Sequence, residues 1–154
     1  MKLECLFVGK TSKKYIGEGI QVYLKRLKHY IAVDIRVISN SSVGTQGMVV
    51  KKESEQILKM IGLKDFVVLL DERGKEIGSV QLADFINKSM VEGTVKIIFI
   101  IGGAYGVSQD VADRANLKLS FSKFTFTHQM IRLFLLEQIY RAMTIIRKEP
   151  YHHS

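Results

Sequence analysis

Two stretches in the last third of the chain carry residue types that could do chemistry. A strand-like run over 95–101 breaks at Gly102-Gly103-Ala104-Tyr105-Gly106, and a polar stretch runs from Leu119 to His128. Glycines lack side chains, so a ligand can approach their backbone N–H and C=O groups closely. Ligands of open parallel sheets gather at the carboxyl ends of strands, where both Leu70-Asp71 and Gly102-Gly103 are expected. These segments predict a site for a small cofactor.

The same residues have ordinary structural alternatives. Gly102, Gly103 and Gly106 do not fit the G-x-G-x-x-G fingerprint and could form a bare turn. Asp71 could hydrogen-bond a ribose, or it could simply begin a turn before Gly74. The position of the glycines at a strand end is therefore better evidence for a site than their spacing.

The four histidines do not have the spacing of a metal site. His29, His128, His152 and His153 form no pattern with cysteine or carboxylates, and no P-loop, H-E-x-x-H, C-x-x-C or G-x-S-x-G pattern occurs. His128 could cap the helix that follows it. His152 and His153 could belong to a frayed terminus, or they could contact a substrate. The sequence predicts no metal.

The charge of the chain points to a polyanionic partner. Lysine and arginine number 23 against 15 acidic residues, which gives a net charge of +8. The surplus is concentrated early, where only Glu4 and Glu18 oppose the basic residues before residue 31. Nucleic acid is the first candidate, and a solvated helix face is the alternative. The basic residues in this region are Lys2, Lys10, Lys13, Lys14, Lys25, Arg26 and Lys28.

Length and composition favour one cytoplasmic domain over residues 1–154. A chain of 154 residues buries about 68–70% of its unfolded surface, and 47% hydrophobic residues argue against disorder. The longest apolar runs, such as 66–70, fall far short of the roughly 20 residues of a membrane span. The N-terminus does not read as a signal peptide. The single cysteine, Cys5, cannot form an intrachain disulfide and reads as a buried strand residue.

Strand and helix patterns alternate along the chain, which predicts an α/β fold with a mostly parallel sheet covered by helices. Ser12 is expected to cap the first helix, and 71–75 to form a turn. Strands are predicted at 3–8, 32–38, 66–70, 95–101 and 118–121, and helices at 12–30, 49–61, 79–91, after Ser108, and at 129–147.

The last predicted helix is apolar around most of its circumference. Its polar stripe is narrow and holds Glu137, Arg141, Thr144 and Lys148, with Glu137 and Arg141 spaced to pair. A helix on a small sheet needs only one apolar face, so the second is expected to meet another subunit. The chain is therefore predicted to form a homodimer.

A series of short motifs extends along the chain and resembles one family. The motifs are Leu70-Asp71, Gly74-Lys75, Ile101-Gly102-Gly103 with Gly106, Leu119-Ser120-Phe121-Ser122, Thr125-Phe126, His128-Gln129, Glu137-Gln138, Tyr140-Arg141-Ala142 and Tyr151-His152. In order and length they resemble the small SPOUT-class methyltransferases of bacterial large ribosomal RNA, the ribosomal large subunit methyltransferase H family. The resemblance covers essentially the whole chain, including the starting Met1-Lys2-Leu3.

The resemblance implies methylation of N3 of a pseudouridine in 23S rRNA with S-adenosylmethionine, in the large subunit or the assembled ribosome. It also implies a homodimer and a C-terminal trefoil knot, which sequence rules alone would not predict because knots are so rare. One departure is Thr127, where relatives commonly carry proline. The implied cofactor positions are Leu70, Gly102, Gly103, Ser122, Lys123, Phe124, Thr125, Phe126 and Thr127.

The same resemblance places Arg141, Tyr151 and His152 near the target base. Arg141 is expected to stabilise the developing pyrimidine anion, and His152 to accept a proton or orient the base. Tyr151 is expected to stack on the nucleotide or hydrogen-bond it. Lys10, Lys13, Lys14, Lys25 and Arg26 are expected to contact phosphates.

Two other functions are consistent with the charge of the chain. A non-catalytic, ribosome-associated RNA-binding protein would explain the basic surface but would leave the glycine turns without a role. A SPOUT methyltransferase acting on tRNA would share the cofactor but not the substrate. The sequence does not identify the general base, nor does it say whether two subunits share one active site.

Overall fold

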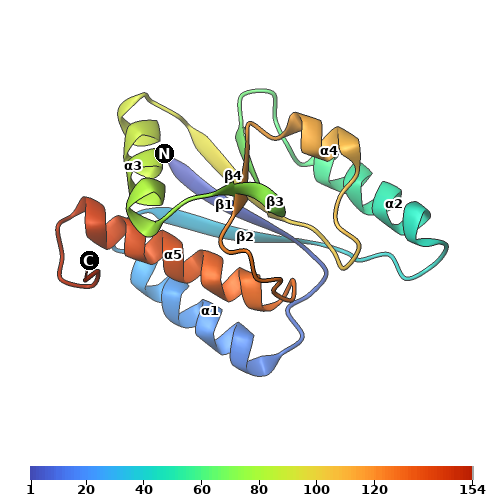
Figure 1. Ribbon diagram of the computed structural model, residues 1–154, viewed down its shortest axis with the longest axis horizontal. Coiled ribbons are helices and arrows are strands. Elements are labelled where there is room, and N and C mark those ends of the chain that lie inside the picture. The colour runs from blue at the N-terminus through green and yellow to red at the C-terminus, as the bar shows by residue number, and fades with distance from the viewer. Residues whose placement is uncertain (154) are drawn as a thin grey trace.

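The computed structural model describes residues 1–153, and its centre is a five-stranded parallel sheet (Figure 1). The strand order is β2-β1-β4-β3-β5. This arrangement confirms the predicted α/β class. The strands are β1 (Lys2–Val8), β2 (Ala32–Ile38), β3 (Phe66–Glu76), β4 (Lys96–Ile101) and β5 (Leu117–Ser120).

Helices cover both faces of the sheet. Figure 1 shows α1, α3 and α5 on one face and α2 with α4 on the other. None of the helices described is long and apolar enough to cross a membrane. The helices are α1 (Lys14–Leu27), α2 (Gln46–Lys59), α3 (Ser79–Val91), α4 (Gln109–Arg114) and α5 (Met130–Ile146).

Alternate residues of the central strands feed two separate cores. In β4, Phe99 packs with the cluster on the α1, α3 and α5 side, whereas Ile98 and Ile100 pack on the α2 and α4 side. Successive side chains of a strand point to opposite faces. A strand buried on both faces therefore reads as a continuous apolar run, as predicted for β3 and β4. Cys5 is buried in β1, as expected, and burial raises the pKa of its thiol to about 12.

The turn predicted at 71–75 is wrong, because β3 continues to Glu76. The strand breaks register after Leu70 and pairs again with β5 through Lys75 and Glu76. The reason is the close approach of β3 and β5 at Gly74, where an added Cβ would lie 2.6 Å from the carbonyl carbon of Leu119. The glycine therefore lets β3 continue alongside β5, and the chain does not reverse direction here.

Two predicted helix starts are also wrong. Ser12 does not cap α1, which begins at Lys14, because the backbone N–H groups of Ser12 and Lys13 donate to the side chain of Gln129. Helix α2 begins earlier than predicted, at Gln46, because Thr45 Oγ1 accepts a hydrogen bond from the backbone of Met48. A threonine cap of this kind offsets unpaired N–H groups of the first turn.

Helix α5 differs from its predicted pattern at two residues. Thr144 was expected in the polar stripe, but it is buried and its hydroxyl donates to the carbonyl of Arg141. Arg132 is fully buried among apolar neighbours. The predicted pair does form, because the Arg141 guanidinium donates to Glu137 Oε1 at 2.7 and 3.0 Å. The pattern thus located the ion pair but not the buried cation.

Candidate active site

A cavity of about 700 Å³ lies at the carboxyl ends of β3, β4 and β5. These ends lie at one edge of the sheet because the three strands are parallel. Its wall is formed by three stretches of chain, 69–73, 101–107 and 119–128 without Lys123, together with Ile131. The volume falls in the range of about 300–1,000 Å³ that is usual for small-molecule sites.

The structure brings eight of the nine expected cofactor residues to this cavity. Lys123 is exposed and is not part of the wall, although both of its neighbours are. The eight that line it are Leu70, Gly102, Gly103, Ser122, Phe124, Thr125, Phe126 and Thr127.

Two glycines of the turn after β4, Gly102 and Gly103, are packed closely against neighbouring atoms. A Cβ on Gly102 would lie 2.9 Å from Val107 Cγ1 and 3.2 Å from the carbonyl oxygen of Gly106, and one on Gly103 would lie 2.7 Å from Glu53 Oε2. Gly106 has a φ of +78°, which L side chains rarely adopt. The turn therefore needs glycine for its own packing, and the same absence of side chains leaves its backbone facing the cavity.

The stretch from Ser122 to Thr127 is ordered by its own polar side chains. Ser122 Oγ accepts from the backbone N–H of Phe124 at 3.0 Å, and Thr125 Oγ1 donates to Glu72 Oε2 at 3.3 Å. Thr127 Oγ1 accepts from the backbone N–H of Met130 at 3.2 Å, so Thr127 rather than His128 caps α5 with its side chain. The threonine that departs from the family pattern thus has a structural role of its own.

Asp71 lies in the cavity wall and is held by Arg73. Its carboxylate accepts from the backbone N–H of Arg73 at 2.8 Å and from the Arg73 guanidinium at 3.2 and 3.3 Å. These hydrogen bonds hold the pKa of Asp71 below its ordinary value. The carboxylate is therefore ionised at neutral pH.

A second set of polar residues lies from the middle of α5 onward and in the C-terminal tail, the residues that follow this helix. Glu137 Oε1 accepts from the Arg141 guanidinium and, at 3.1 Å, from Tyr151 Oη. The Arg141 guanidinium lies 4.8 Å from the centre of the Tyr151 ring, and its Nη1 is 3.4 Å from His152 Nδ1. We call these four residues the tail cluster. The hydrogen bonds to Glu137 raise the pKa of Arg141, and burial raises that of Tyr151.

The tail cluster does not line the cavity. Ile131 belongs to the cavity wall, and Arg141 follows it by ten positions on the same helix. At 1.5 Å of rise per residue the two are about 15 Å apart along the axis. The residues expected to bind cofactor and those expected to contact the base thus form two separate groups in one chain.

Two residues that sequence reasoning missed hold the loop before α1 against the start of α5. The Gln129 amide accepts from the N–H groups of Ser12 and Lys13 at 3.0 and 3.2 Å and donates to the carbonyl of Lys10 and the hydroxyl of Ser12, both at 3.1 Å. The Arg132 guanidinium donates a hydrogen bond to the carbonyl of Val8, the last residue of β1. Together they fix the loop that carries Lys10 and Lys13.

Arg132 is a buried cation without an acidic partner in hydrogen-bond range among the described residues. Its guanidinium donates to the Val8 carbonyl at 2.7 Å and to Thr11 Oγ1 at 3.0 Å, and it lies 5.0 Å from the centre of the Phe7 ring. Burial lowers its pKa to about 10. A single charged residue on the apolar side of the helix, beside Leu135 and Leu136, was the signal that could have found it.

His128, which the sequence suggested as a possible helix cap, lies in the cavity wall. Burial lowers the pKa of His128, and the nearby charge of Arg132 lowers it further. The imidazole is therefore mostly neutral at neutral pH. Within residues 1–153 no group of three or more His, Cys, Asp or Glu side chains could hold a metal ion.

Comparison with known proteins identifies what the fold resembles. Residues 1–152 match the family model described as a predicted SPOUT methyltransferase. A *Bacteroides fragilis* protein is 47% identical over all of both chains, and a *Christiangramia forsetii* protein is 44% identical over 99% of each; both are named ribosomal RNA large subunit methyltransferase H. A probable methylase family protein from *Haemophilus influenzae* has a similar fold, with a TM-score of 0.59, 12% identity, and coverage of 99% of this chain and 70% of that one.

Proposed function

Because the chain belongs to the SPOUT methyltransferase family and to its ribosomal large subunit methyltransferase H branch, we propose that it methylates N3 of a pseudouridine in 23S rRNA, with S-adenosylmethionine as donor. The observation that carries the proposal is the convergence of three separate segments, 69–73, 101–107 and 119–128, on one cavity. We expect this single domain, 1–154, to act in the cytoplasm.

The cavity fits the proposed cofactor in size and in construction. Gly102, Gly103 and the stretch from Ser122 to Thr127 would hold the cofactor, because they line the cavity and the two glycines leave their backbone groups open to a ligand. The Asp71 carboxylate, ionised in the wall, is suited to a hydroxyl or a positive group. When bound, S-adenosylmethionine supplies a methyl group on a positively charged sulfur.

For this reaction the protein must align the two reactants and assist removal of one proton from N3. The pyrimidine N3 forms a bond to the methyl carbon, the carbon–sulfur bond breaks, and the N3 proton must leave. Alignment of this kind can lower a barrier by roughly 7–11 kcal/mol. Arg141, fully charged beside Glu137, is suited to stabilise the pyrimidine anion. His152 would accept the proton or orient the base, and Tyr151 would stack on the nucleotide.

A homodimer would bring the two groups together. Arg141 lies about 15 Å along α5 from Ile131 in the cavity wall of its own chain, which favours its use at the cavity of a partner chain. Large apolar side chains of α5 that are only half-buried, such as Met130 and Phe134, support such a partner. Mixing an Arg141→Ala protein with a Gly102→Ala protein tests this. Heterodimers would regain one complete site, whereas no regained activity would contradict sharing.

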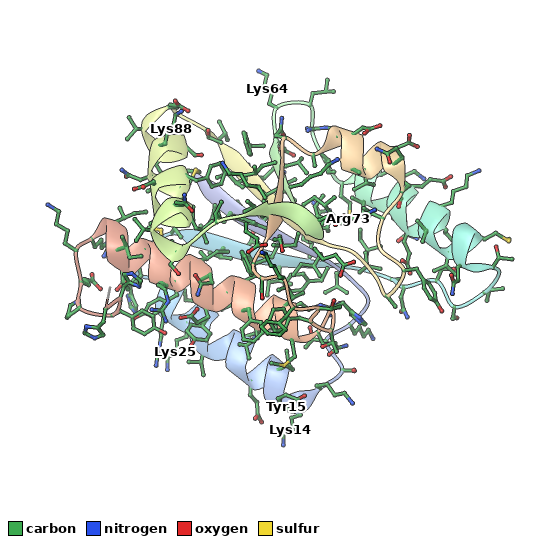
Figure 2. All side chains as sticks on the ribbon, in the orientation of Figure 1. Lys14, Tyr15, Lys25, Lys64, Arg73 and Lys88 are labelled. Carbon is green, nitrogen blue, oxygen red and sulfur yellow. The ribbon has the colours of Figure 1, made fainter. Side chains whose placement is uncertain are left out.

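The substrate side of the proposal rests on the basic surface around α1. Lys14 and Lys25 extend into solvent from this helix (Figure 2). With Lys10, Lys13 and Arg26 they would contact phosphates of the large subunit RNA, in the subunit or in the ribosome. RNA affinity should therefore fall steeply as salt rises.

Methylation of ribosomes from a strain that lacks this activity tests the proposed function. The purified protein and S-adenosylmethionine are incubated with those ribosomes, and the modified nucleotide is mapped by mass spectrometry. A new methyl group on N3 of a 23S rRNA pseudouridine is the expected result. If only tRNA is methylated when it is supplied in a parallel incubation, the tRNA alternative is supported, and cofactor-independent RNA binding without methylation would support a non-catalytic protein.

A further inference from the structure

The chain reverses direction after α5 and brings its tail back onto the helix. Lys148 has a φ of 58°, the left-handed conformation that commonly ends helices. The N–H of Lys148 donates to the carbonyl of Ile145, and that of Glu149 to the carbonyl of Thr144, both at 2.9 Å. This turn is what allows Tyr151 to reach Glu137.

Two residues that follow α1, His29 and Tyr30, contact the residues of this turn. Tyr30 Oη donates a hydrogen bond to Glu149 Oε2. Arg147 lies over the Tyr30 ring, 4.4 Å from its centre, and its Nη2 donates to the carbonyl of His29 at 2.9 Å. The hydrogen bond to Glu149 raises the pKa of Tyr30 to about 12, so the hydroxyl stays a donor at neutral pH.

The contact continues from Tyr30 into the tail cluster. The rings of Tyr30 and Tyr140 meet edge to face at 5.7 Å, and those of Tyr140 and Tyr151 at 4.8 Å. Glu149 is separated from Tyr151 only by Pro150, whose φ is fixed by its ring. Fixing Glu149 therefore restricts where the Tyr151 and His152 side chains can lie.

We propose that Tyr30 and Glu149 form a clasp that positions the catalytic tail for methyl transfer. Both are positioning residues, since they act through Tyr151 and His152, and this role rests on the proposed function. The clasp lies outside the buried core, because Tyr30 and Glu149 are only half-buried. Removing the hydroxyl of Tyr30 leaves its ring contacts in place, so the fold should persist while the tail loses its fixed position.

The kinetic test uses Tyr30→Phe, Glu149→Ala and the double variant. Each is expected to lower the single-turnover methylation rate by about tenfold or more while cofactor affinity, measured by calorimetry, stays within about twofold. The double variant should lose no more than the worse single variant, because both remove one interaction. Glu149→Gln keeps an acceptor oxygen and should recover part of the rate. Tyr15→Phe is the matched control, since Tyr15 is 63% exposed and extends into solvent from α1 (Figure 2).

A second readout separates failure of the clasp from failure of the proposed function. In protein labelled with ¹³C-histidine, Tyr30→Phe should shift or broaden the His152 signals and leave the His128 signals unchanged. The proposal is overturned if Tyr30→Phe keeps the wild-type rate, or if the His152 signals do not change. If the wild-type protein methylates no rRNA, only the proposed function is contradicted. The effect of Tyr30→Phe on the histidine spectrum still tests whether the clasp positions His152.

Discussion

The cavity and the tail cluster occupy different stretches of α5, with Ile131 about 9 Å from Glu137 and about 15 Å from Arg141 along the axis, and they are built from different parts of the residues. The cavity depends on the absence of side chains at Gly102 and Gly103 and on the stretch from Ser122 to Thr127, which polar side chains hold in place. The tail cluster consists of charged and aromatic side chains that bind one another around Glu137. The first should be sensitive to added atoms and the second to removed ones, and the two should fail in different steps.

The largest expected effect is loss of catalysis on Arg141→Ala. The guanidinium donates to Glu137 and lies over the Tyr151 ring, so its removal takes away the proposed stabilising charge and loosens the cluster. Single-turnover methylation should fall about 10²–10³-fold. Cofactor affinity should stay unchanged. Lys88→Ala is the control, because Lys88 extends into solvent on α3, in a different helix (Figure 2). Near-normal methylation by Arg141→Ala would remove the assigned role.

The next effect is loss of cofactor binding on Gly102→Ala. The added Cβ would lie 2.9 Å from Val107 Cγ1 and 3.2 Å from the Gly106 carbonyl, so the turn must move. Cofactor affinity, followed by calorimetry, should weaken by about tenfold or more. Gly17→Ala is a matched control, since a Cβ there meets nothing within 4 Å. That control should stabilise α1 by roughly 0.5–1 kcal/mol. Unchanged affinity in Gly102→Ala would mean that the cofactor binds elsewhere.

A smaller effect is expected at the loop that precedes α1 and carries Lys10 and Lys13. Gln129→Ala removes the four hydrogen bonds that the Gln129 side chain makes to 10–13 and should weaken RNA affinity several-fold by loosening Lys10 and Lys13. Gln129→Glu keeps the acceptor oxygen but loses both donors, so filter binding should place it between wild type and alanine. If alanine binds RNA as tightly as wild type, the loop is not part of the RNA site.

The smallest effect concerns the acid stability of the cavity wall. The pKa of Asp71 is lowered in the folded protein. Its contribution to the free energy of unfolding is therefore present above the unfolded pKa near 3.8 and is lost as pH falls through the lower folded pKa. Asp71→Asn should cost under about 1 kcal/mol of unfolding free energy at pH 7, because Arg73 is largely exposed. Urea titrations at pH 7 and pH 2 check this. A difference that persists undiminished at pH 2 would contradict the assignment to the charge.

Strand and helix periodicity predicted the sheet well, because β3 and β4 are buried on both faces and read as continuous apolar runs. It failed at 71–75, where composition favoured a turn. The deciding feature there is the approach of Gly74 to Leu119, a contact between residues far apart in the chain. The trefoil knot implied by the family remains a prediction for the same reason, since local patterns carry no information on threading.

The site residues divide in the same way. The residues that the family motifs assign to the cofactor line one cavity, apart from Lys123, and their role in binding remains a prediction. They could not reveal that Arg141 lies away from that cavity. The distance between Arg141 and the cavity can be worked out only after Ile131, on the same helix, is known to lie in the cavity wall. Arg132 was missed because a lone arginine on an apolar helix usually extends its charge to water, whereas here backbone and hydroxyl oxygens bind it.

Calorimetric titration of S-adenosylmethionine into the wild type, Gly102→Ala and Arg141→Ala tests the central division of labour most directly. Saturable binding is expected in the wild type and in Arg141→Ala with equal affinity, and much weaker binding in Gly102→Ala. If the wild type gives no binding heat, or if Arg141→Ala loses the cofactor as completely as Gly102→Ala, the separation of a glycine-dependent cofactor cavity from a catalytic tail of charged and aromatic side chains is wrong.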